Sequence, residues 1–78
     1  MNVSPEVKST LEALYKDINI HSDLDWEVTI AGNGTNASEA INVMDGIFNA
    51  LGLPKPQYTS EERKAVIENA GEDPEDYD

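Results

Sequence analysis

The sequence contains no cysteine and few basic residues, with five lysines and arginines against sixteen aspartates and glutamates. Without cysteine, the chain can form neither a disulfide framework nor a thiolate metal site. It has no apolar run long enough for a transmembrane helix, and no basic segment followed by an apolar one marks a signal peptide. These absences predict a cytoplasmic protein.

The formal net charge of −11 over 78 residues is the dominant property of the composition. Such a charge opposes direct attraction to nucleic acid or to an anionic membrane. The length predicts a single compact domain with a small core over residues 1–71. Five of the seven residues 72–78 are acidic, so we expect them to form a disordered acidic tail.

A first helix is predicted over residues 4–18. Ser4 is a good N-cap residue, and Pro5 suits the first helical position, where its missing N–H has no partner to lose. Apolar residues at helical spacing form a stripe about 100° wide that predicts one buried face. The stripe consists of Val7, Leu11, Leu14, Tyr15 and Ile18.

A strand is predicted at Trp26–Ile30, where apolar residues alternate with Glu27 and Thr29. One strand alone cannot form a sheet. Residues 19–25 contain several turn-forming residues and predict a loop, but a short strand near Ile20 would supply a partner. The alternative is pairing with a second copy of the chain across a dimer.

A second helix is predicted between Asn36 as N-cap and Gly52 as the residue that ends it. Its expected buried stripe consists of Ala37, Ala40, Ile41, Met44, Ile47, Phe48 and Leu51. After a proline-restrained connector, Thr59 and Glu62 have capping-box spacing, which predicts a third helix over residues 60–70. The resulting order of helix, strand, helix and helix predicts a small α+β domain.

The segment Gly32–Ala37 matches the pattern G-x-G-x-x-A between a predicted strand and a predicted helix, the context of a phosphate-binding turn. A dinucleotide site also needs a second parallel strand ending in an acidic residue about 20 positions on. That position falls in the proline-rich connector, and no lysine or arginine occurs between Lys16 and Lys55. We therefore interpret the glycines as a tight turn and expect no cofactor.

Asp23, Asp25 and Glu27 form an alternating acidic group, but a calcium loop beginning at Asp23 fails, because its sixth and twelfth positions are not glycine and glutamate. His21 is the only histidine, without the neighbours of a nucleophile–base pair. We expect no metal site and no enzyme. Trp26 is predicted to anchor the core, with an interface role as the alternative.

The composition favours a protein that binds another protein. In size, charge and lack of cysteine, the chain resembles small phage-encoded inhibitors, including anti-CRISPR proteins and DNA mimics. This resemblance implies an inhibitor that occupies the basic, nucleic-acid-binding surface of a partner protein, in the host cytoplasm if a phage encodes it. The residues predicted to bind that partner are Asp17, Asp23, Asp25 and Glu27, together with Glu39 and Asp45 if the second helix lies alongside. The alternative is a homodimeric assembly adaptor that completes a sheet through its single strand.

Overall fold

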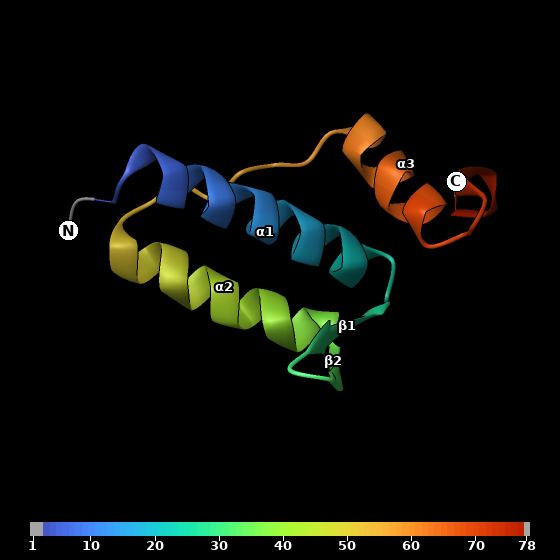
Figure 1. Cartoon of the computed structure of the whole chain (residues 1–78), viewed down its shortest axis with the longest axis horizontal. Coiled ribbons are helices and arrows are strands. Elements are labelled where there is room, and N and C mark those ends of the chain that lie inside the picture. Colours follow the sequence, from blue (N-terminus) through green and yellow to red (C-terminus); the bar gives the residue numbers. More distant parts are fainter. Residues whose placement is uncertain (1–2, 78) are drawn as a thin grey trace.

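The computed structural model describes residues 3–77, which form an α+β domain with three α-helices and a two-stranded antiparallel sheet (Figure 1). This confirms the predicted fold class. The elements, in chain order, are α1 (Pro5–Asp23), β1 (Glu27–Ile30), β2 (Asn33–Asn36), α2 (Ala37–Leu51), α3 (Ser60–Asn69) and the 3-10 helix η1 (Pro74–Tyr77).

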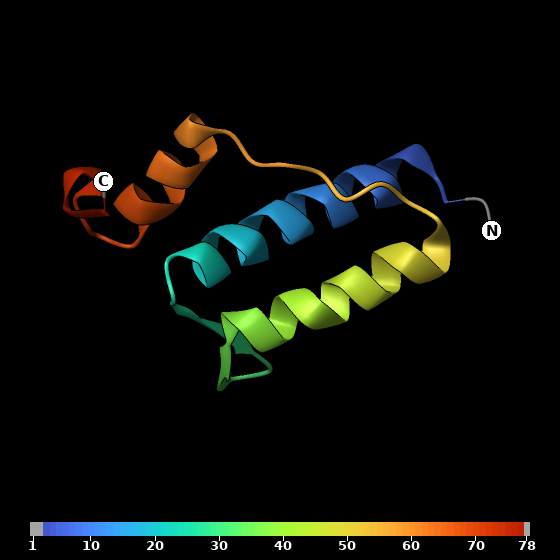
Figure 2. The ribbon, with the colours of Figure 1, turned by 180° about the vertical axis from the view of Figure 1, so that it is seen from behind.

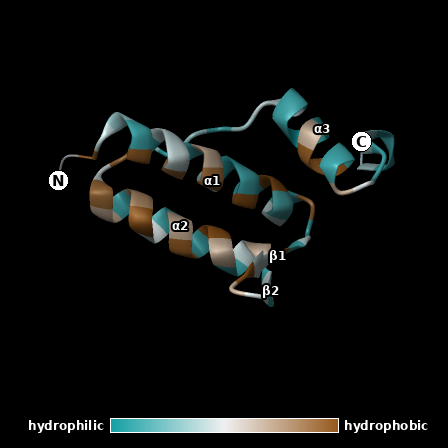
Figure 3. Ribbon diagram, in the orientation of Figure 1, coloured by the Kyte–Doolittle hydropathy of each residue, from teal (hydrophilic) through white to brown (hydrophobic). Residues whose placement is uncertain are grey.

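The core lies between α1 and α2, which run antiparallel along most of their length (Figures 1 and 2). The hydroxyls of Ser22 and Ser38 are 3.2 Å apart at one end of the pair, and Tyr15 reaches α2 further along. Both helices carry apolar residues along their length, whereas α3 is mostly hydrophilic (Figure 3). The buried cluster between them consists of Tyr15, Ile18, Ala40, Met44 and Phe48.

Helix α1 is longer than its apolar pattern predicted, because it continues through residues 19–23. Ile20 is therefore helical, and the prediction of a short strand near it is wrong. Its side chain is only 2% exposed, and it lines the groove between α1 and α3 together with Val66. The turn-forming residues in this segment did not stop the helix because neither proline nor glycine is among them.

The partner of β1 is β2, which follows it immediately in a hairpin, so the sheet forms within one chain and needs no second copy. Ile30 pairs with Asn33, which leaves Ala31 and Gly32 as a two-residue loop. Both have positive φ, 51° and 82°, as the twist-compatible type I′ hairpin turn requires. Glycine adopts this region freely, whereas Ala31 does so at a cost of about 1–2 kcal/mol.

The predicted helix ends at Asn36, Gly52 and Thr59 are confirmed. The Asn36 side chain accepts a hydrogen bond from the Ser38 amide, and Gly52 ends α2 in the left-handed conformation. Thr59 and Glu62 form both hydrogen bonds of the capping box at the start of α3. Within residues 3–77, none of the helices has the length and apolarity that a membrane span needs.

The described part of the acidic tail contains one turn of 3-10 helix, η1, where the sequence predicted disorder. The Tyr77 ring lies edge-on to Trp26, with centroids 5.5 Å apart, and its backbone carbonyl accepts a hydrogen bond from Arg63. Asp78 lies outside the described residues. Trp26 itself is half-buried between His21 and Tyr77, and it is not part of the cluster between α1 and α2.

Candidate protein-binding surface

Four of the six carboxylates predicted to bind a partner belong to the end of the molecule that carries the hairpin. Asp23 ends α1, Asp25 lies in the following turn, Glu27 begins β1, and Glu39 lies in the first turn of α2. Glu27 pairs in the sheet with Asn36, the N-cap residue of α2, so the sheet brings the two segments together. We call these four residues the acidic end.

Three members of the acidic end have no cationic neighbour. Among the described residues, no lysine, arginine or histidine lies within ion-pair distance of Asp25, Glu27 or Glu39, and all three are exposed. Asp23 differs because its carboxylate accepts a short hydrogen bond from the Tyr58 hydroxyl. That bond, followed by partial burial, raises the pKa of Tyr58. Asp23 therefore helps to hold the connector that precedes α3.

Asp45 lies away from the acidic end and has a structural role. Its carboxylate accepts a 2.7 Å hydrogen bond from the Tyr15 hydroxyl and lies 3.5 Å from the Lys55 ammonium group. Burial, together with this hydrogen bond, raises the pKa of Tyr15 to about 12. Asp45 thus joins α1, α2 and the connector after α2, and its charge is partly compensated within the chain.

Asp17 is exposed on α1, and its backbone carbonyl and carboxylate both lie near the ring of His21, one turn later. It borders the groove between α1 and α3, as Lys16 and Glu62 do. The structure therefore places Asp23, Asp25, Glu27 and Glu39 at the hairpin end of the molecule and leaves Asp17 and Asp45 elsewhere. Sequence spacing could not reveal this division, since it depends on where α1 ends.

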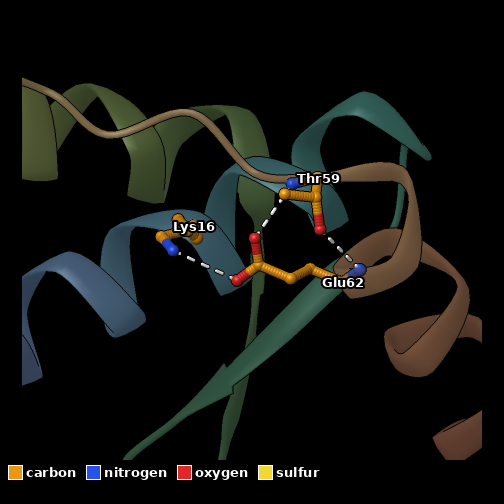
Figure 4. Close-up of polar contacts among 3 residues, drawn as sticks. All are labelled: Lys16, Thr59 and Glu62. Carbon is orange, nitrogen blue, oxygen red and sulfur yellow. Dashed lines mark hydrogen bonds and ion pairs between the residues drawn. The ribbon is translucent and has the colours of Figure 1, made fainter.

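An ion pair joins α1 and α3 across the groove between them (Figure 4). Lys16 donates to Glu62 over 3.2 Å, while the Thr59 amide donates to the other oxygen of the same carboxylate over 2.9 Å. The Thr59 amide first, and then Lys16, lower the pKa of Glu62. The capping residue of α3 is thus also its anchor on α1.

An exposed apolar groove between α1, the hairpin and α2 was not predicted from the sequence. Leu14, Ile30 and Val43 line it and are 45%, 50% and 64% exposed. Its other large apolar side chains, Ile18 and Met44, belong to the buried cluster. We call this feature the apolar groove. A signal was available in Val43, which lies beside the predicted buried stripe of α2 and widens it.

The sequence raised two other kinds of site, a metal site and a phosphate-binding turn. Within the described residues, no group of three histidine, cysteine, aspartate or glutamate side chains is placed to hold a metal ion. The glycines at 32 and 34 form the hairpin loop and the strand after it, so their amides do not converge at the start of a helix as a phosphate site requires.

Comparisons with protein-family models, with curated proteins and with solved structures found no match for this chain.

Proposed function

We propose that this chain is a non-enzymatic protein-binding module whose acidic end contacts a basic surface of a partner protein. In this proposal the chain covers a surface of the partner that is lined by lysine and arginine, so the partner cannot bind nucleic acid there. The observation that supports the proposal is the uncompensated charge of Asp25, Glu27 and Glu39, which are exposed and lack a cationic neighbour among the described residues.

The physical basis is the free energy of bringing opposite charges together. Surface ion pairs within one chain contribute little, because the two side chains lose freedom and water screens them. Across an interface, complementary charge raises the association rate and excludes partners of the wrong sign. A net charge of −11 on an accessible surface of 5249 Å² acts at a distance in dilute salt, and about 0.15 M salt reduces its range to roughly 8 Å.

The test compares two variants that each remove three negative charges. The first neutralises the acidic end through Asp25→Asn, Glu27→Gln and Glu39→Gln. The second neutralises exposed carboxylates of α3 and η1 through Glu61→Gln, Glu68→Gln and Asp76→Asn. Asp23 is left intact because its hydrogen bond with Tyr58 is structural.

Each protein is immobilised and used to capture partners from a cell lysate at increasing salt, and circular dichroism verifies the fold. We expect the unmodified chain and the second variant to capture a nucleic-acid-binding protein in a salt-sensitive way. The acidic-end variant should no longer capture it. Equal loss in both variants would show that only total charge matters. If the acidic-end variant still captures the partner, the acidic end is not the binding surface.

The alternative, a homodimer formed through an unpaired strand, has less support. The strand at Glu27–Ile30 already has a partner within the chain, because β2 pairs with it along its whole length. The remaining argument for self-association is the exposed apolar surface, on which two chains of charge −11 would repel each other.

A further inference from the structure

Five large apolar residues of the described chain are exposed, four of them on α1 and α2 and one on the hairpin. They are Val7, Leu14, Ile30, Val43 and Ile47. Leu14, Ile30 and Val43 line the apolar groove directly. Contiguous apolar patches larger than a few hundred Å² are rare on soluble monomers and mark sites that bind a partner.

The remaining two residues extend the apolar groove along the helix pair. Val7 lies two turns before Leu14 on the same side of α1, and Ile47 lies one turn after Val43 on α2. Contacts between α1 and α2 pair later residues of one helix with earlier residues of the other, so the two helices run in opposite directions. Both extensions therefore point towards the same end, and they make a stripe along the seam of the two helices.

No layer of the described structure covers this stripe. Its five residues remain between 38% and 64% exposed within the described structure. Helix α3 packs against α1, where it buries Ile67, and α3 and its connector border α1 through Lys16 and Glu62. Two antiparallel helices with an open apolar seam form a groove that a third helix can fill.

The charge around the stripe determines the kind of helix that fits. Glu39 is the only charged residue that lines the described groove, and neither the hairpin nor α2 contains a lysine or arginine. A second copy would bring carboxylates against carboxylates. A helix with apolar residues on one face and lysine or arginine at their flanks would bury its apolar face and pair its charges with the acidic end.

We propose that the apolar groove is the docking site for a basic amphipathic helix of a partner protein. This deepens the proposed function by naming the structural class of the partner, and it rests on the partner being basic. It adds an apolar contact that the acidic end alone does not supply.

The probe is a synthetic peptide of 15 leucine and lysine residues arranged with helical periodicity, which equals α2 in length. A peptide of the same composition with strictly alternating leucine and lysine is the control. Val43→Asp places a carboxylate in the groove, and Asn42→Asp places the same charge at the preceding position, outside the groove lining. Both positions are exposed, so both variants are expected to fold.

Binding is measured by titration calorimetry, and chemical shifts locate the contact. We expect the helical peptide to bind the unmodified chain and shift the methyl signals of Leu14 and Val43. Because the peptide would bury the Val43 side chain, Val43→Asp should weaken binding at least tenfold, whereas Asn42→Asp should change affinity less than twofold. The added negative charge in Val43→Asp favours a basic peptide, so weaker binding identifies an apolar contact.

Three outcomes overturn the inference: no binding of the helical peptide, equal affinity for the alternating peptide, or unchanged affinity in Val43→Asp. If Val43→Asp binds normally while the acidic-end variant does not, the peptide binds by charge alone, and the proposed function stands without the groove. If the acidic-end variant binds normally while Val43→Asp does not, the groove stands and the charge proposal fails. Self-association abolished by Val43→Asp would identify a second copy as the occupant instead.

Discussion

Replacing Tyr15 with phenylalanine tests whether Asp45 serves the fold. The Tyr15 side chain is 7% exposed, packs 4.9 Å from the Phe48 ring centroid and donates a 2.7 Å hydrogen bond to Asp45. Tyr15→Phe retains the ring and removes only the hydroxyl. A hydrogen bond to a charged group contributes about 1.5–3 kcal/mol. Because Asp45 retains Lys55 and partial access to water, we expect a loss at the lower end, about 1.5 kcal/mol.

The same hydroxyl gives the prediction a pH signature. Folding raises the pKa of Tyr15 from 10.0 to about 12. The associated stabilisation is therefore complete below pH 10 and is lost as the pH rises towards 12, since the unfolded chain ionises first. One pKa unit corresponds to about 1.4 kcal/mol, so roughly that much is lost by pH 11. Phenylalanine cannot titrate, so the difference in unfolding free energy between the two proteins should fall to about zero near pH 11.

The assay is urea denaturation followed by circular dichroism at pH 8, 10 and 11. The difference in unfolding free energy between the two proteins isolates Tyr15, since every other titrating group is common to both. Equal stability at pH 8 would refute the structural role of the Tyr15–Asp45 bond. A difference that stays constant from pH 8 to pH 11 would refute the argument from the raised pKa.

Two further predictions concern α3 and the residues after it. Because the Thr59 amide and Lys16 lower the pKa of Glu62, their stabilisation is present above pH 4.5 and is lost as the pH falls through the lower folded value. Lys16→Met should therefore move the acid-induced loss of helicity, followed by circular dichroism, to higher pH than the charge-matched control Lys8→Met does. A chain shortened to remove η1 should still melt cooperatively, but its free energy of unfolding should fall by about 0.5–1.5 kcal/mol, because the Tyr77 ring no longer contacts Trp26. The fluorescence of Trp26 should shift to the red, and an unchanged spectrum would contradict the contact between the two rings.

The features that the sequence predicted correctly are those set by residues close together in the chain. The capping box of Thr59 and Glu62 needs only a side chain and an amide three residues apart, and Gly52 ends α2 through its own backbone freedom. Such local requirements appear directly in the residue pattern. The α+β class followed because the helical and alternating periodicities of the longer segments are distinct.

The second strand was missed because its residues carry no strand signal. Asn33–Asn36 contains neither alternating apolar residues nor a β-branched pair, and its pairing arises from the two-residue turn before it. That turn places Ala31 in the left-handed region, which sequence statistics reserve mainly for glycine and asparagine. The hairpin therefore depends on the surrounding structure more than on the propensity of its own residues.

The candidate site was only half predictable for a related reason. Helical periodicity identified Val7 and Leu14 as members of an apolar stripe, and the stripe was read as buried. Periodicity reports which residues share a face, but it does not report how many elements cover that face. In this domain a single neighbouring helix covers α1 on that side, so Val7 and Leu14 remain about half exposed. The exposure of these two residues, which the pattern predicted to be buried, is what points to an interface.

The two proposed surfaces have separable roles in one binding event. Long-range attraction from the acidic end acts before contact, so it should govern the association rate and weaken as salt increases. The apolar groove acts only after contact, so it should govern the dissociation rate, which salt screens little. Neutralising Glu27 and its neighbours should then slow association, whereas Val43→Asp should speed dissociation. If both changes altered the same rate constant, charge and apolar contact would belong to a single surface, and the division proposed for this domain would be wrong.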